Sequence, residues 1–281
     1  MTVRPVDMPA IDFGEGARWW ASGPVHGPVQ VDLMAGRLLS VGPAGIAELL
    51  ALDVPLGAAA PRAGGGLALV AGTGVRLLDE DGEAVVIDTG LDPRAMRVND
   101  ACTDVTGRLW FGVMAYDAEP GAGSLWCLEP DRTLTRVLQG LTIPNGPVID
   151  HERGWLYLAD SDRGLIRRGP VDVATGELGT LERFAQVPDA SPDGMALDDE
   201  GMLWSALWGG SRLHGYDTDG SLAAVVPLPT SQPTSIAFDP AGGPALVTTA
   251  RHGLARPGDL DGASLWVNLQ RSAPAAPPYA G

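Results

Sequence analysis

The stretch Asp104-Val-Thr-Gly-Arg-Leu-Trp-Phe-Gly112 combines an acidic turn, a glycine and a short alternating apolar run. Asp and Gly favour tight turns because both tolerate backbone conformations that other residues avoid. A short apolar run bounded by such turns is typical of a β-strand. The stretch therefore predicts one turn followed by one strand.

The same phrase recurs along the chain. Clear copies begin at Asp150 and Asp198, and weaker copies begin at Met34, Gly66 and Asp239. The glycines of the six copies, at positions 36, 66, 107, 154, 201 and 243, lie 30, 41, 47, 47 and 42 residues apart. Periods near 40–50 residues with strand content are typical of propeller blades. The repeats predict an all-β fold, a six-bladed β-propeller with four-stranded antiparallel blades around a central channel.

No domain boundary is visible, so we expect residues 1–281 to form a single domain. The run Arg4–Phe13 precedes the first copy and could supply the outer strand of the last blade, near Ser264–Leu269. Such a closure would hide two strand edges. The tail Ser272–Gly281 is rich in Ala and Pro, and we expect it to fray.

The formal net charge is −16, and all 19 basic residues are arginines. Such acidity repels phosphate backbones and anionic lipids, so we expect no nucleic acid and no membrane partner. An acidic surface favours binding of a cation or a neutral substrate. The acidity can also have no role other than to keep the protein soluble. The 38 glycines and 24 prolines argue against a helical protein.

Cys102 and Cys127 are the only cysteines, too few for a disulfide framework. The N-terminus has no apolar run behind a basic start, so no signal peptide is expected. No stretch approaches the roughly 18 apolar residues of a membrane span. We therefore expect a cytoplasmic protein, monomeric or weakly self-associating.

The common hydrolase and nucleotide-binding motifs are absent, and no two histidines are close in sequence. What remains are polar residues at the starts of apolar strands. Glu15 lies between two glycines, while Asn145 and Asp193 each stand in the phrase Pro-[Asn/Asp]-Gly and are 48 residues apart. This separation matches the blade period, so both side chains are expected to face the central channel.

Glu15, Asn145 and Asp193 would together give two carboxylates and one amide carbonyl. These hard oxygen ligands suit Ca²⁺, Mg²⁺ or Mn²⁺ better than a soft-ligand metal. Two adjacent carboxylates would repel each other unless a cation neutralised them. Three protein ligands would also leave positions open for water and substrate. Taken singly, however, each Pro-[Asn/Asp]-Gly phrase also reads as an ordinary turn.

These phrases resemble the SMP-30/gluconolactonase/regucalcin-like family when they are taken with further motifs in the same order, namely Arg97-Val-Asn-Asp100, Gly107-Arg-Leu-Trp-Phe-Gly-Val-Met114, Tyr157-Leu-Ala-Asp-Ser161 and Gln232-Pro-Thr-Ser-Ile-Ala-Phe238. The likeness runs from about Gly14 to Arg251. It implies a six-bladed propeller.

The resemblance also implies roles for individual residues. Glu15, Asn145 and Asp193 match the family's metal ligands, and Asp193 also matches its proposed acid/base. Arg97 and Asn99 match a pair that holds substrate oxygens, and Asn99 matches a residue that sometimes joins the metal shell. The implied cofactor is one divalent cation, with calcium preferred and zinc, magnesium, manganese or iron as alternatives.

One segment departs from the family pattern. Where some relatives place an acidic residue, this chain reads Val113-Met-Ala-Tyr-Asp117, so Asp117 is our candidate for that substrate-binding position. Most tryptophans are expected in the blade core. Trp208, beside Gly209-Gly210 in a loop, is the exception that could meet substrate.

The sequence thus predicts a metal-dependent hydrolase that opens a sugar lactone such as an aldono-lactone, with Asp193 activating water. Hydrolysis of organophosphates or aryl esters on the same fold is one alternative. A calcium-binding propeller without turnover is another. The particular lactone, the native metal and the oligomeric state stay open.

Overall fold

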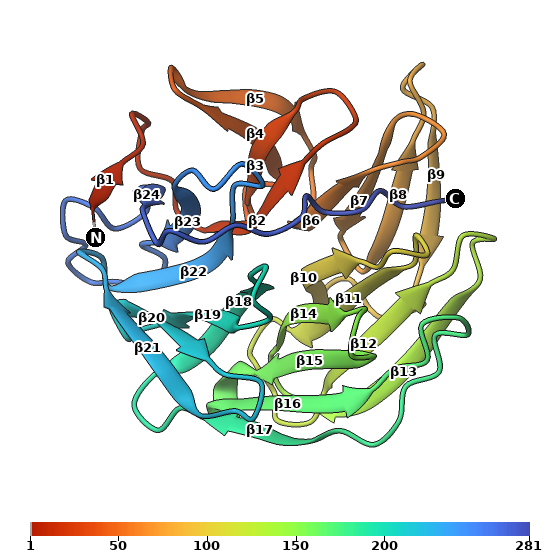
Figure 1. The fold of residues 1–281 in the computed structure, drawn as a ribbon. Helices are drawn as coiled ribbons and strands as arrows, with labels where there is room; N and C mark the ends of the chain where they lie inside the picture. Colours follow the sequence, from red (N-terminus) through yellow and green to blue (C-terminus); the bar gives the residue numbers. More distant parts are fainter. Residues whose placement is uncertain (1) are drawn as a thin grey trace.

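The computed structural model describes residues 2–281 and confirms the predicted propeller. Within these residues, six four-stranded antiparallel sheets stand in a ring (Figure 1). The first strands of neighbouring blades contact one another around the axis. They therefore form the inner wall, and we number the blades 1 to 6 in their order.

The first three blades follow one another without a break in the chain. Their strands are, for blade 1, β2 (Gly14–Trp20), β3 (Gly27–Asp32), β4 (Arg37–Gly42) and β5 (Gly45–Ala51); for blade 2, β6 (Leu56–Pro61), β7 (Leu67–Ala71), β8 (Gly74–Leu78) and β9 (Ala84–Asp88); and for blade 3, β10 (Met96–Thr103), β11 (Leu109–Ala115), β12 (Gly123–Leu128) and β13 (Leu134–Leu141).

Blades 4 and 5 continue the pattern, and blade 6 takes one strand from the N-terminus. Their strands are, for blade 4, β14 (Pro144–Asp150), β15 (Trp155–Asp160), β16 (Leu165–Pro170) and β17 (Glu182–Gln186); for blade 5, β18 (Ser191–Leu197), β19 (Leu203–Trp208), β20 (Arg212–Tyr216) and β21 (Leu222–Pro227); and for blade 6, β22 (Gln232–Ala237), β23 (Ala245–Ala250), β24 (Leu265–Val267) and β1 (Val3–Pro5). One short 3₁₀ turn, η1, spans Ser161–Arg163.

The repeated acidic residue organises the turn from first to second strand. The Asp104 carboxylate accepts hydrogen bonds from the amides of Thr106 and Arg108, at 2.9 and 3.0 Å, and from the Trp110 indole at 3.0 Å. Asp198 makes the corresponding bonds to Glu200, Met202 and Trp204. Since the indole is buried in the blade, the carboxylate ties the turn to the core.

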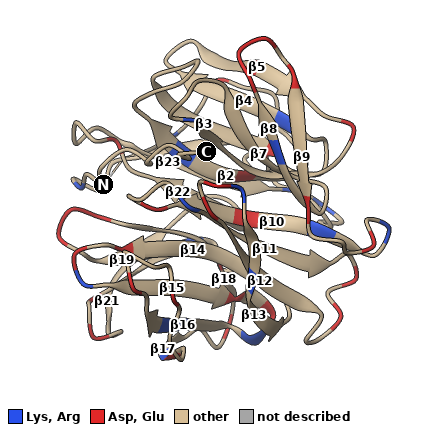
Figure 2. Ribbon diagram, turned by 90° about the vertical axis from the view of Figure 1, so that its right-hand side faces the viewer, with Lys and Arg blue, Asp and Glu red and all other residues tan. Residues whose placement is uncertain are grey.

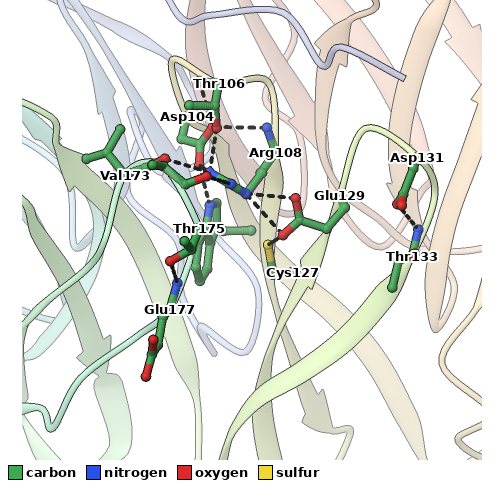
Figure 3. A network of polar contacts seen from close by, with 12 residues as sticks. Asp104, Thr106, Arg108, Cys127, Glu129, Asp131, Thr133, Val173, Thr175 and Glu177 are labelled. Atoms are coloured by element: carbon green, nitrogen blue, oxygen red, sulfur yellow. Dashed lines mark hydrogen bonds and ion pairs between the residues drawn. The ribbon is translucent and has the colours of Figure 1, made fainter.

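Arg108 extends this turn to the next blade (Figure 3). Its Nε donates to Glu129 at 2.8 Å, and its Nη1 donates to the carbonyl oxygen of Val173 at 2.8 Å. The network therefore has a structural role, because it joins blades 3 and 4 at the ends of their strands.

One repeat has a different place from the one we expected. The glycines at 66, 107, 154, 201 and 243 all lie between the first and second strands of their blades, whereas Gly36 lies between β3 and β4. Blade 1 makes its first turn at residues 21–26 without the acidic phrase. This shift explains why the first spacing is only 30 residues.

Each innermost strand breaks its pairing register near its start. The irregularities fall between Glu15/Arg18, Leu56/Ala58, Val98/Ala101, Asn145/Val148, Pro192/Met195 and Pro233/Ser235. A β-bulge bends its strand and re-aims the side chains around it. The backbones also approach closely: a Cβ at Gly57 would lie 1.8 Å from the carbonyl oxygen of Asn99.

The ring closes with an N-terminal strand, as predicted, but this strand spans Val3–Pro5 rather than the expected run Arg4–Phe13. β1 pairs antiparallel with β24 and becomes the outermost strand of blade 6, with Val3, Arg4 and Pro5 opposite Val267, Trp266 and Leu265. Blade 6 is thereby built from both ends of the chain.

The prediction that the C-terminal tail frays is wrong. Residues 272–281 cross the ring on the face that carries the first turns (Figure 1). Their backbone amides bond to blade 1 at Trp19, to blade 2 at Pro61 and to blade 3 at Gly107. Tyr279 is fully buried in the core between blades 2 and 3. The residues between the prolines retain their N–H groups, which donate to carbonyl oxygens of the blades.

Asp and Glu are spread over loops around the whole ring rather than gathered in one patch (Figure 2). Within residues 2–281, no helix is both long enough and apolar enough to cross a membrane.

We predict that Tyr279→Ala lowers the free energy of unfolding by about 3–5 kcal/mol, because it empties a fully buried aromatic site. Tyr279→Phe should cost only about 0.5–1.5 kcal/mol, because it loses the 2.8 Å hydrogen bond to the Glu129 carbonyl oxygen. Chemical denaturation measures both. Tyr116→Ala, at an exposed position, is the control and should stay within about 0.5 kcal/mol of the parent. Equal stability of Tyr279→Ala and parent would contradict a tail that holds the ring.

Candidate functional site

The three predicted metal ligands lie at the starts of innermost strands from three blades. Glu15 is in β2, Asn145 in β14 and Asp193 in β18, and all three are buried. The Asn145 side-chain amide donates a hydrogen bond to Asp193 Oδ1, and the charge of Asp193 raises the pKa of Glu15. The fold therefore brings together residues that are up to 178 positions apart in the sequence.

Glycines hold two of these side chains in place. The Gly146 amide donates to Asn145 Oδ1 at 3.0 Å, and the Gly16 amide donates to Glu15 Oε2 at 2.9 Å. Gly16 and Gly146 have φ values of 58° and 49°, a conformation that favours glycine. The Glu-Gly and Asn-Gly pairs are thus parts of the inner-strand bulges, not free turns.

The two carboxylates are forced toward the protonated form in the metal-free protein. Burial is the main cause that raises the pKa of Asp193 to about 8. Burial, followed by the negative charge of Asp193, raises the pKa of Glu15 well above its usual range. A divalent cation would relieve this repulsion, and the carboxylate and amide oxygens are its preferred donors. The residues present therefore fit the implied metal.

Arg97 and Asn99 lie beside this group on β10. Arg97 is only 7% exposed, and its Nη1 donates to Asn99 Oδ1 at 2.7 Å and to the Val98 carbonyl oxygen at 2.9 Å. Burial lowers the pKa of Arg97, while the nearby Glu15, Tyr116 and Asp193 act in the opposite direction. Asn99 Nδ2 donates to the Pro144 carbonyl oxygen at 3.0 Å, which fixes its orientation.

Asp117 lies apart from these residues. It is exposed in the turn after β11, where its Oδ1 accepts a hydrogen bond from the Glu119 amide at 3.2 Å. Within the described chain, no hydrogen bond or ion pair joins it to Arg97. The preceding Tyr116, 42% exposed, is the residue of this turn that influences Arg97.

An aromatic cluster stands at the same ends of the strands. Phe13, two residues before Glu15, has its ring centroid 5.3 Å from that of Trp208 and 5.2 Å from that of His252. Trp208 ends β19 opposite Ser191, two residues before Asp193. Trp110 and Trp204 are buried in the blades as expected, whereas Trp208 is only half-buried.

The sequence analysis missed two charged residues of the channel. Asp100 follows Asn99 directly and is 1% exposed, and Arg18 Nη2 donates to its Oδ1 at 2.8 Å. The position of Asp100 inside a quoted motif was the available signal for it. Nothing comparable marks Arg18, whose contact spans 82 residues.

A cavity of about 610 Å³ lies at the other end of the channel, away from the predicted ligands. Its lining includes Arg18 and Cys102, the first turns of blades 4 and 5, and the tail at Ala273–Pro277. The cavity is thus separate from the carboxylate site, with Arg18 at the boundary between them.

Comparisons with known proteins agree with the resemblance seen in the sequence. The family model described as the SMP-30/Gluconolactonase/LRE-like region matches residues 13–251. The chain is 34% identical over 279 residues to a pentonolactonase of Haloferax volcanii, covering 94% of this chain and 88% of the relative. It is 30% identical over 213 residues to a 6-deoxy-6-sulfogluconolactonase of Pseudomonas putida, covering 74% and 73%.

The fold is also similar to that of a solved calcium-binding protein, a regucalcin from Agrobacterium tumefaciens. That structure superposes with a TM-score of 0.87 at 26% identity and covers 99% of this chain and 97% of its own.

We predict that the metal-free protein becomes less stable as the pH rises from about 4 to about 8. Asp193 keeps its proton over this range when folded, because its pKa is about 8, but loses it when unfolded, where the usual value is 3.8. The unfolded state therefore binds fewer protons, and stability falls by up to about 1.4 kcal/mol per pH unit. Denaturation after chelation measures the slope, which Asp193→Asn should flatten. A stability that rises with pH in the parent would contradict the prediction.

Proposed function

The chain belongs to the SMP-30/gluconolactonase/LRE-like family, and from this premise we propose that it hydrolyses a sugar lactone with one divalent cation held by Glu15, Asn145 and Asp193. Relatives named as a pentonolactonase, a sulfogluconolactonase and an L-arabinolactonase support the lactone as substrate. The observation that carries the proposal is the buried pair Glu15–Asp193 beside the Asn145 amide. Two buried carboxylates with raised pKa values call for a cation.

Calcium is our first choice of cation because all three donors are oxygens, and a relative described as calcium-binding shares the fold. Zinc, magnesium, manganese and iron remain alternatives. When bound, the cation would polarise the lactone carbonyl and keep the carboxylates ionised.

Asp193 is the proposed general base. It removes a proton from the attacking water as the water oxygen bonds to the lactone carbonyl carbon. The ring C–O bond then breaks, and the released ring oxygen takes up a proton to give the open hydroxy acid. The Asn145 amide donates to Asp193 Oδ1, which orients the carboxylate toward this role.

Arg97 is the proposed substrate anchor. Within the described chain only its Nη1 donates hydrogen bonds, so Nε and Nη2 remain for substrate oxygens. Asn99 fixes the guanidinium by accepting from Nη1 at 2.7 Å. We keep Asp117 as a candidate for contact with a larger substrate, since it is exposed in the neighbouring turn.

A panel of pentono- and hexono-lactones tests the function. The protein is treated with a chelator and assayed by acid release with Ca²⁺, Zn²⁺, Mg²⁺ or Mn²⁺ added back separately. We expect turnover of at least one lactone that depends on the added cation. Cation binding without any lactone turnover would instead indicate a non-catalytic calcium-binding propeller. Turnover restricted to aryl esters or phosphotriesters would indicate the alternative hydrolase.

We predict that Asp193→Asn keeps the fold and lowers kcat by about 10²–10⁴-fold, because it retains an oxygen ligand but removes the base. Steady-state kinetics measures the loss on protein of known cation content. Asp189→Asn, at a surface residue paired with Arg212, is the matched control and should keep full activity. Activity of Asp193→Asn within threefold of the parent would exclude Asp193 as the base.

We predict that Arg97→Ala lowers kcat/KM by roughly 10- to 150-fold and leaves the cation content unchanged. The change removes a charge-assisted hydrogen bond, worth about 1.5–3 kcal/mol, from a group that cannot ligate a cation. Arg97→Lys should restore only part of the loss, since it lacks the planar fork. Arg94→Ala removes an exposed arginine three residues away and is the control. A lower melting temperature with unchanged kcat/KM would assign Arg97 to the scaffold.

A further inference from the structure

We propose that Asp100 is a further residue of the cation site, where its unpartnered oxygen adds negative charge behind the ligands and Arg18 balances that charge from the opposite side. The inference rests on the proposed cation site and goes beyond its three ligands.

Asp100 has one satisfied oxygen and one free oxygen. Oδ1 accepts hydrogen bonds from Arg18 Nη2 and from the Ala101 amide, both at 2.8 Å. Oδ2 is buried and has no hydrogen-bond partner among the described residues. A buried carboxylate oxygen without a partner is costly, and a cation bound nearby would stabilise it.

The inner strand β10 places the Asp100 carboxylate next to the proposed cation site. Asp100 lies inside the bulge of β10, between Val98 and Ala101, directly after the Asn99 that contacts Arg97. Asn99 in turn donates from Nδ2 to the carbonyl oxygen of Pro144, the residue before Asn145, at 3.0 Å.

Asp100 stands behind the ligands rather than among them. Over residues 2–281, no three His, Cys, Asp or Glu side chains form a group that could hold a metal ion, so Asp100 is not counted among the ligands. A buried charge that does not ligate a cation still acts strongly on it, because the interior has a low dielectric constant. Asp100 is therefore a positioning and charge-balancing residue.

Arg18 supplies the balancing positive charge. Its Nη1 donates to the Ala17 carbonyl oxygen at 2.6 Å, and its Nη2 donates to Asp100 and to the Ala101 carbonyl oxygen. The side chain is 13% exposed and lines the 610 Å³ cavity at the far end of the channel. The positive charge of its guanidinium opposes binding of a second positive charge nearby.

A purely structural ion pair makes a different prediction. Breaking a buried pair destabilises a protein wherever the pair lies, but it leaves the affinity for a cation elsewhere unchanged. Asp32 offers a matched control in blade 1: it is buried, its Oδ2 accepts from Arg37 Nη2 at 2.7 Å, and its Oδ1 has no partner in the described chain.

The test measures Ca²⁺ and Mn²⁺ affinity by calorimetry on chelated protein, together with the melting temperature with and without cation. We expect Asp100→Asn to weaken binding at least tenfold and to reduce the stabilisation by the cation. Arg18→Met should lower the melting temperature of the metal-free protein yet bind the cation several-fold more tightly. Asp32→Asn should change stability only, with affinity within twofold of the parent.

The outcomes separate this inference from the proposed function. If the parent binds neither cation, the proposed site itself fails. If the parent binds and Asp100→Asn stays within twofold of it, Asp100 is only structural and the inference is overturned. If Asp100→Asn does not fold, Arg18→Met decides, because unchanged or weaker cation binding in that variant overturns the charge balance.

Discussion

The central constraint is the balance of charge buried on the propeller axis. Glu15, Asp100 and Asp193 bring three carboxyl groups into a channel wall where Arg18 and Arg97 supply positive charge. Burial raises the pKa of all three acids and so favours their protonated forms in the metal-free protein. In the proposed function, cation binding, acid–base chemistry and the pH dependence of stability would all depend on this one buried group of charges.

The inner-strand bulges make that concentration of charge geometrically feasible. Each first strand loses its pairing register within a few residues of its start. A β-bulge at this position turns the side chains away from the regular alternation of a strand. Glycine allows the backbones to meet there, as at Gly57 against Asn99. The same bulge, repeated around the ring, thus brings Glu15, Asn145 and Asp193 together.

The ring that supports the bulges is fastened by both chain ends. The N-terminal strand completes blade 6, and the C-terminal segment crosses to blades 1, 2 and 3 and buries Tyr279. The same segment lines the cavity at the far end of the channel, with Arg18 between that cavity and the acids. The acids lie toward the other end of the channel, where Tyr116 is exposed and Trp208 is half-buried.

The sequence by itself determined the propeller, the closing strand and the phrases around Asn145 and Asp193, because turns and strand periods are local and repeat with the blade. It misplaced Gly36, since blade 1 makes its first turn without the acidic phrase. It also missed the anchored tail, because the composition of the tail does not indicate which carbonyl oxygens its amides bond to. Only the tertiary structure decided that Arg18 meets Asp100 across 82 residues. Pairing between blades depends on three-dimensional packing, which leaves no periodic trace in the chain.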